Sequence, residues 1–281
     1  MIIEVADPRG RYKVNVELEN ITQEQYNEII AYFYENIQSK KPARAVTDTY
    51  LRAIEICPLA NPADLWWHCI YRTYLDRYGS DQSWKRTAGF ALEDVYVDFY
   101  SPLLRPHNIL ISTLSKADAY SAMAKMGISD KVGKSKLDII LYGELPDHNL
   151  EVFGGAHVKS SIAERIQDDV PASVAMMGAG YWSGFLTLDV KAFPPPHGDA
   201  IVRGELGFRN DPEGALKRNY FERDGQFDNC YSYNLRTIPS QGETISGKRI
   251  YRLAFNDPKP DQFMIDVIAA WEQRKKVISS S

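Results

Sequence analysis

The spacing of apolar residues predicts that the N-terminal part of the chain is mainly helical. Residues 1–18 alternate around the turn signal Asp7-Pro8-Arg9-Gly10, which indicates a β-hairpin. Beyond it, apolar side chains recur at intervals of three and four residues, the spacing of amphipathic helices. The helices predicted here are Gln23–Gln38, Ala45–Ile56 and Pro62–Tyr78. We therefore expect a hairpin and helical subdomain over residues 1–80.

Beyond residue 80 the pattern changes between helical spacing and short apolar runs. The predicted helices are Trp84–Tyr100, 118–127, Ser161–Asp169, Ser173–Tyr181 and Asp261–Lys276. The predicted strands are Leu137–Tyr142, Val152–Val158, Phe185–Phe193 and segments near 200–208, 229–235 and 249–255. This order indicates an α/β (α+β) fold in which helices flank a central mixed β-sheet. We expect residues 81–281 to form this second domain.

Composition and charge narrow the class of protein only slightly. The 37 acidic residues outnumber the 33 basic ones, for a net charge of −4, which disfavours a non-specific DNA-coating protein. A site-specific nuclease remains compatible, because its carboxylates hold Mg²⁺ and its basic residues need line only one cleft. The uncharged stretch Val170–Leu188 contains Pro171 and three glycines, so we interpret it as a buried helix and strand, with no membrane partner. Three cysteines without a CxxC pair favour reduced thiols in the cytoplasm.

The most informative candidate residues are an acid and a lysine on successive predicted strands. Asp138 interrupts the apolar run Leu137–Leu141, where a carboxylate is costly unless it is paired or bound to a metal. Lys159 ends the next predicted strand. Neighbouring strands can bring both side chains to one end, where they could hold a divalent metal beside a scissile phosphate. The alternative interpretation of Asp138 is an ordinary salt bridge.

A second motif of the same type competes with this one. Asp189-Val190-Lys191 also has an acid and a lysine at the end of a predicted strand, and it could form a site with Glu151 or Asp138. A run of three prolines follows it, however, instead of a helix that could contact DNA bases. We therefore favour the site at Asp138 and Lys159.

The arrangement resembles the core of the PD-(D/E)XK nucleases. His157-Val158-Lys159 stands where the family has (D/E)-X-K, with His157 in place of the usual acid. Restriction endonucleases that cut sites containing CCGG or CCNGG share this departure, and their missing carboxylate lies on the helix after the lysine. The chain is most similar to BsaWI-type enzymes, over roughly residues 80–255. The stretches that carry this likeness are SWKRTAGFALE, HVKSSIAERIQDDVPAS, TLDVKAFPPP, GELG and FERDGQFDNCYSYNLRT.

The resemblance implies a further metal-binding acid on a helix that precedes the first core strand. Glu93 occupies that place and would bind the metal together with Asp138. The alternative interpretation is a surface acid that pairs with Lys85 or Arg86. Lys159 is implied as the catalytic lysine.

The resemblance also implies a carboxylate on the helix after the lysine. The family position corresponds to Ala172, so we expect Asp168, one helical turn earlier on the same face, to substitute for it. Asp169, which could instead pair with Arg165, and His157 are the alternatives.

The resemblance also implies residues that bind DNA bases. The family has an Arg-(Asp/Glu)-Arg motif that begins four residues after the lysine, and this chain has Ala163-Glu164-Arg165 there. Glu164 would accept hydrogen bonds from cytosine amino groups, and Arg165 would bind guanine through O6 and N7. The first arginine of the motif is absent. The candidates to replace it are Arg203, Lys217 and Arg218.

These features together predict a type II restriction endonuclease. The implied reaction is Mg²⁺-dependent hydrolysis of palindromic double-stranded DNA that contains CCGG. A palindromic site requires a two-fold symmetric protein, so the expected assembly is a homodimer, and related enzymes also form tetramers. The alternatives are a repair or recombination nuclease without sequence specificity and a catalytically inactive DNA-binding protein.

We predict that Arg165→Ala removes the preference for the cognate site. Loss of one bidentate base contact costs about 1–3 kcal/mol on the cognate sequence only, whereas loss of a phosphate contact weakens binding to all sequences alike. Competition binding against cognate and scrambled duplexes at two salt concentrations separates the two. A uniform loss of affinity would show that Arg165 contacts the DNA backbone.

Overall fold

The computed structural model of the 281-residue chain describes most of the protein. The described residues are 1–6, 12–130, 132, 137–163, 166–192, 200–206 and 212–280. The predicted turn at Asp7–Gly10 lies outside them, as do Glu164 and Arg165.

The N-terminal region contains the predicted hairpin and helices. Strands β1 (Ile2–Ala6) and β2 (Lys13–Glu17) pair antiparallel, and helices α1 (Gln23–Ser39) and α2 (Pro42–Ile56) follow. Thr22 caps α1 because its hydroxyl accepts from the N–H of Gln25, whose side chain in turn accepts from the Thr22 N–H. The sequence therefore identified both the hairpin and the start of this helix.

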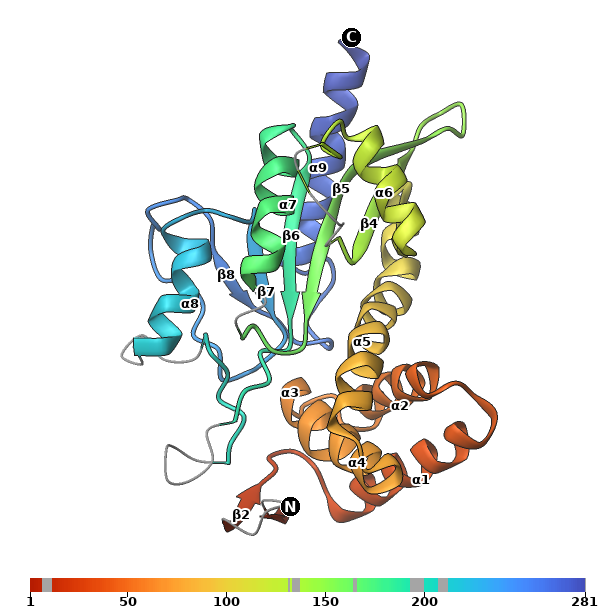
Figure 1. The fold of residues 1–281 in the computed structure, drawn as a ribbon, viewed down its shortest axis with the longest axis vertical. Coiled ribbons are helices and arrows are strands. Elements are labelled where there is room, and N and C mark those ends of the chain that lie inside the picture. Colours follow the sequence, from red (N-terminus) through yellow and green to blue (C-terminus); the bar gives the residue numbers. More distant parts are fainter. Residues whose placement is uncertain are drawn as a thin grey trace.

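The third predicted helix, over residues 62–78, has a π-helical segment in its middle. It consists of α3 (Pro62–Asp64), the π-helix η1 (Leu65–Tyr71) and α4 (Arg72–Tyr78). The long helix α5 (Asp81–Leu104) follows and runs from this helical region to the β-sheet (Figure 1). Helix α5 contacts α2 at one end and the sheet at the other, so it connects the N-terminal helices to the sheet.

Within the described residues, six strands form the main sheet in the order β3-β4-β5-β6-β7-β8. The strands are β3 (Ile109–Thr113), β4 (Ile139–Glu144), β5 (Leu150–Lys159), β6 (Trp182–Thr187), β7 (Asn229–Ser232) and β8 (Ile250–Arg252). Strands β3 to β5 pair antiparallel, whereas β5 to β8 pair parallel. The predicted mixed sheet is thus confirmed.

Helices cover both faces of this sheet (Figure 1). The remaining helices are α6 (Lys116–Lys125), α7 (Ile166–Gly178), α8 (Pro212–Glu222) and α9 (Gln262–Ser279). On β4, Ile139 and Leu141 join the core beneath α5 and α9, while Ile140 between them joins the core beneath α6 and α7. Alternate residues of a strand point to opposite faces, so this strand is apolar on both.

The core beneath α5 and α9 extends into the N-terminal helices. Tyr50 of α2 packs edge-on against Trp66 and Phe255, with ring centroids 4.9 and 6.1 Å apart. The Tyr100 hydroxyl lies 2.5 Å from that of Tyr233 and donates to Asp261 at 2.6 Å. These contacts join the two predicted domains, whose boundary near residue 80 stays a prediction.

Four elements differ from those that the sequence pattern predicted. The described part of residues 161–181 contains one helix, α7, instead of two, and it continues through Pro171. The segment near 200–208 is irregular in its described part, apart from a bridge between Ala192 and Val202. Strand β3 and helix α8 were not predicted. Burial of Ile166, Ala172 and Met176 stabilises α7 enough to offset the bond that Pro171 cannot make.

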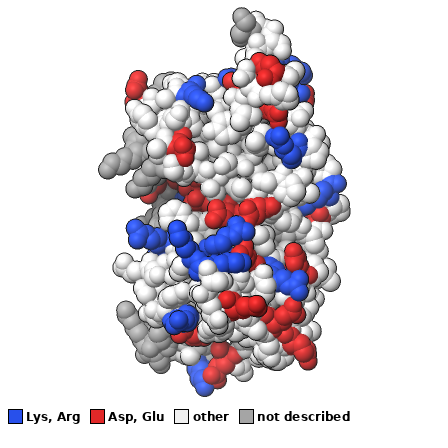
Figure 2. All heavy atoms as spheres, turned by 90° about the vertical axis from the view of Figure 1, so that its right-hand side faces the viewer, with Lys and Arg blue, Asp and Glu red and all other residues white. Residues whose placement is uncertain are grey.

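The surface carries charges of both signs (Figure 2), and the cysteines form no disulfide among the described residues. Figure 2 shows the right-hand side of Figure 1, where acidic and basic side chains lie together in a band across the middle. Cys57, Cys69 and Cys230 are buried free thiols. In the described part of the chain, none of the helices has the length and apolar character needed to span a membrane.

We predict that Gly143→Ala lowers the free energy of unfolding by about 1–3 kcal/mol, the usual range for an overpacked core. A Cβ at this position of β4 would lie 2.3 Å from the buried ring of Trp271 on α9. Gly89→Ala is the matched control, because a Cβ there meets nothing within 4 Å and alanine favours the helix α5. Urea unfolding of both variants checks this; equal stabilities would contradict the packing argument.

Candidate active site

The start of β4 and the end of β5 bring the two main candidate residues into contact. Antiparallel pairing of Ile139 with Ala156 places Asp138, just before β4, beside the last residues of β5. Asp138 Oδ2 accepts from the Val158 N–H at 2.8 Å and from Lys159 Nζ at 2.8 Å. The salt bridge expected from the alternative interpretation therefore forms, and its partner is Lys159 itself.

Helix α7 adds a second carboxylate to this pair. Asp169 lies 2.9 Å from Lys159 Nζ and is only 1% exposed, whereas the adjacent Asp168 is exposed. The structure thus places Asp169, and not the expected Asp168, beside the lysine. Successive residues on a helix point about 100° apart, and α7 turns Asp169 inward together with Ala172 and Ser173. That apolar face was the signal in the sequence that could have identified Asp169.

His157 lies next to these acids on the same face of β5 as Lys159. Its ring is fully buried and packs edge-on against Phe227, with centroids 5.4 Å apart. Asp138, His157 and Asp169 each offer a ligand atom, and these atoms lie within 4.8 Å of one another. Two carboxylates and an imidazole at this spacing can surround a divalent cation.

Glu93 lies on α5 and interacts electrostatically with Asp138 and Lys159. Burial first, and then the negative charge of Asp138, raise its pKa to about 8, although Lys159 opposes the shift. The expected surface partner Lys85 instead forms an ion pair with Asp81, at 2.9 Å. Glu93 therefore belongs to the electrostatic environment of Asp138 and Lys159.

The charges in this cluster do not balance. Burial by itself would lower the pKa of Lys159, but attraction to Asp138 and Asp169 outweighs it and raises that pKa. The pKa of Asp169 is raised, chiefly by burial, despite the nearby His157 and Lys159. In the described part of the chain, one ammonium thus faces three carboxyl groups with Glu93 included. Carboxylate oxygens are the ligands that Mg²⁺ prefers, so the donor set fits a divalent cation.

The competing Asp189-Val190-Lys191 motif has a different role. Asp189 is fully buried, and its carboxylate accepts from the N–H groups of Glu205 at 2.7 Å and Leu206 at 2.9 Å. Burial raises its pKa to about 7, although both bonds oppose the shift. Glu151 lies 2.7 Å from Arg274. Among the described residues, Asp189 therefore organises a loop, and the alternative site does not assemble.

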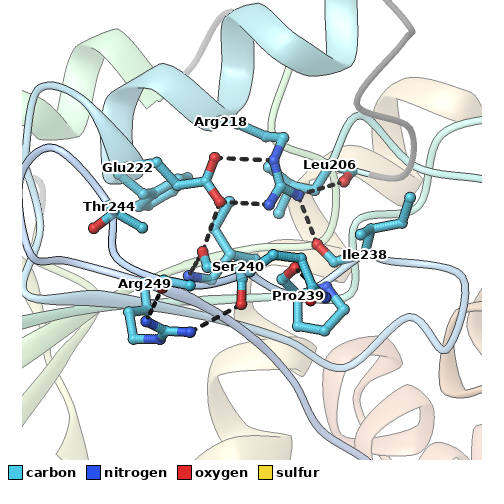
Figure 3. A network of polar contacts seen from close by, with 12 residues as sticks. Leu206, Arg218, Glu222, Ile238, Pro239, Ser240, Thr244 and Arg249 are labelled. Atoms are coloured by element: carbon cyan, nitrogen blue, oxygen red, sulfur yellow. Dashed lines mark hydrogen bonds and ion pairs between the residues drawn. The ribbon is translucent and has the colours of Figure 1, made fainter.

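The structure describes the base-contact segment only up to Ala163. Of the residues proposed to replace the missing arginine, Lys217 donates to the Ala163 carbonyl at 2.6 Å. Arg218 is only 3% exposed and binds Glu222 and the carbonyls of Leu206 and Ile238 (Figure 3). The Arg218 proposal is therefore corrected, since a guanidinium held inside this network cannot reach DNA.

A groove opens beside Ala163, between α7 and α8. Its volume is about 820 Å³, and its polar lining includes Gln167, Lys191, Lys217 and Arg223. Its charged residues are of both signs, because Glu205 and Asp224 also line it and Asp224 pairs with Arg223 at 2.7 Å. The groove begins at Ala163, the last described residue before those expected to contact bases.

Comparison with known proteins identifies the class of this one. Residues 111–258 match the family described as BsaWI restriction endonuclease type 2. The type II restriction enzyme AgeI of Thalassovita gelatinovora is 44% identical over 265 residues, which cover 91% of this chain and 94% of that enzyme. The crystal structure of a specific AgeI–DNA complex matches with a TM-score of 0.88 at 42% identity, over 96% of this chain and 99% of the other.

The fold, the acidic cluster and these similarities define a type II restriction endonuclease, which is a site-specific deoxyribonuclease. The chain belongs to the BsaWI restriction endonuclease type 2 family. The expectation drawn from the sequence motifs is thus confirmed for the class of enzyme and for the fold.

We predict that Asp169→Ala reduces the rate of DNA cleavage by at least about a hundredfold, whereas Asp168→Ala leaves it within about threefold of the wild type. Removal of a group that organises charge in an active site typically costs about 10²–10³ in rate. The adjacent exposed acid is a control of identical chemistry. Single-turnover cleavage assays measure both, and a large loss in the Asp168 variant alone would restore the original assignment.

Proposed function

We propose that this endonuclease cleaves both strands of palindromic DNA containing CCGG and requires Mg²⁺. The cluster of Asp138, Lys159 and Asp169, where β4 begins and β5 ends, is the main support for this proposal. The reaction is hydrolysis of a phosphodiester by water. AgeI, which is 44% identical to this chain, is a type II restriction enzyme, and the matching crystal structure is of AgeI bound to DNA.

Asp138, Asp169 and Glu93 are the residues that would hold the metal ion, with His157 beside them. The hydrogen bond from the Val158 N–H fixes the Asp138 carboxylate at the end of β5. When bound, a divalent ion polarises the phosphate and lowers the pKa of water. The excess of carboxyl groups over ammonium groups in the cluster is the observation that supports its binding.

Lys159 supplies the positive charge that belongs to the protein itself. Its ammonium group is held by Asp138 and Asp169, so it is oriented before substrate arrives. A raised pKa keeps it protonated at neutral pH. In this position it would stabilise the negative charge that develops on the phosphate, without reorganisation during the reaction.

DNA recognition is assigned to the segment that follows Lys159 and to a symmetric assembly. Glu164 would accept from cytosine, and Arg165 would bind guanine in the major groove. A palindromic site is bound by two copies related by a two-fold axis, so we propose a homodimer. The three unpaired thiols are compatible with work in the cytoplasm.

Digestion of plasmids with Mg²⁺, followed by sequencing of the ends, tests this function. Fragments that end within or beside CCGG sites are expected. Ends without a common sequence would favour a non-specific nuclease. Specific binding without any cleavage would favour an inactive DNA-binding protein.

We predict that Lys159→Ala reduces cleavage by at least about 10²–10³-fold, the range reported for loss of a preorganised charge donor. Binding to a CCGG duplex in Ca²⁺ should stay within about threefold of the wild type, because the lysine acts on the reacting phosphate and not on the bases. Lys248→Ala is the matched control, since Lys248 pairs with Asp228 outside the cluster. Cleavage by Lys159→Ala near the wild-type rate would contradict the assignment.

A further inference from the structure

The backbone of Ala163 is held from both sides by charged side chains. Its N–H donates to Glu205 Oε2 at 2.6 Å, and its carbonyl accepts from Lys217 Nζ at 2.6 Å. Ala163 adopts φ +42°, in the left-handed region that residues with a Cβ seldom occupy. Such a conformation persists only where the surroundings impose it. Glu205 and Lys217 are the groups that impose it here.

Glu205 is itself fixed by the loop organised by Asp189. The Glu205 side chain is 5% exposed, and its N–H is bound by Asp189 at 2.7 Å. Gly204 precedes it with φ +76°, and a Cβ there would lie 2.1 Å from Asp189 Oδ2. The carboxylate of Glu205 therefore meets Ala163 from a position that the fold determines.

Arg218 ties this loop to helix α8, which also carries Lys217. Its guanidinium donates to the carbonyls of Leu206 at 2.9 Å and Ile238 at 2.6 Å, and Glu222 holds its other side (Figure 3). The loop that carries Glu205 and the helix that carries Lys217 are thus connected by hydrogen bonds. Together they bind both sides of the Ala163 backbone.

The position of the Ala163 peptide in the chain suggests what these two hydrogen bonds do. Ala163 lies four residues after Lys159 and directly before Glu164 and Arg165. Its side chain is a single methyl group, so its backbone is the part that neighbouring groups can bind by hydrogen bonds. The groups that hold this peptide therefore act on the backbone directly before the two residues expected to contact bases.

We propose that Glu205 and Lys217 are positioning residues for sequence recognition: by clamping the Ala163 peptide they orient Glu164 and Arg165 towards the C·G base pairs. This inference rests on the proposed function, because it assumes that those two residues contact bases. The clamp acts through the backbone of Ala163, in a motif where the related enzymes have an arginine side chain.

Binding of each variant to a CCGG duplex and to a scrambled duplex of equal composition, in Ca²⁺, tests the clamp. Glu205→Ala and Lys217→Ala should each bind the CCGG duplex about tenfold to a hundredfold more weakly, the range for one lost bidentate base contact. Their affinity for the scrambled duplex should stay within about twofold. Glu205→Gln should retain most of the preference, because its amide oxygen still accepts from the Ala163 N–H.

Two matched controls separate this effect from general loss of charge. Glu151→Ala and Lys248→Ala remove an acid and a lysine whose partners, Arg274 and Asp228, lie outside the site. Both should keep the wild-type ratio of affinities. Thermal unfolding shows which variants are folded. If Glu205→Ala is unfolded, the test rests on Glu205→Gln and on Lys217→Ala, because Lys217 is only half-buried.

The outcomes are distinct for the clamp and for the function on which it rests. An unchanged ratio of affinities in folded Glu205→Ala and Lys217→Ala variants overturns the clamp. An equal loss on both duplexes also overturns it, since Lys217 would then bind phosphates. A wild-type enzyme with no preference for the CCGG duplex overturns the proposed function itself, before any variant is compared.

Discussion

The ion pairs of Lys159 with Asp138 and Asp169 are the interaction on which the rest of the site depends. A buried ammonium is costly unless its partners are in place, and here they come from β4 and α7 while the lysine ends β5. The hairpin must therefore keep its register, and the helix must keep its rotation, for either acid to meet the lysine. Because α5 brings Glu93 to the same charges, the long helix is subject to the same requirement.

The constraint also explains why this site suits a metal-dependent reaction. The cluster contains more carboxyl groups than one lysine can neutralise, and burial of Glu93 and Asp169 raises the pKa of both. Such an arrangement contributes little to stability without a further cation. The fold nevertheless retains it where β4 begins and β5 ends, on two interior strands of the sheet. The buried charged groups of the cluster are therefore explained by the reaction and not by the stability of the fold.

Much of the fold could be predicted because local patterns were strong. Helix α1 begins after its cap at Thr22, and β4 and β5 are apolar runs separated by a turn. The predictions failed where distant contacts override local preference. Asp189 has the appearance of a catalytic motif, yet its carboxylate holds the N–H groups of Glu205 and Leu206. The predicted helix at Ser161 does not start there, because Ala163 adopts φ +42°, which lies outside the right-handed helical region.

The sequence alone indicated the mixed sheet and the pair Asp138 and Lys159, because these depend on residue type and on spacing along adjacent strands. Its resemblance to a known family indicated the class of enzyme. Tertiary structure decided which acid of the following helix lies beside Lys159. Asp168 and Asp169 are neighbours of the same chemistry, and only the rotation of α7 against the sheet distinguishes them. It also brought Glu205 and Lys217, 42 and 54 positions further along the chain, to the backbone of Ala163. Spacing cannot encode such contacts, because they depend on how whole elements pack.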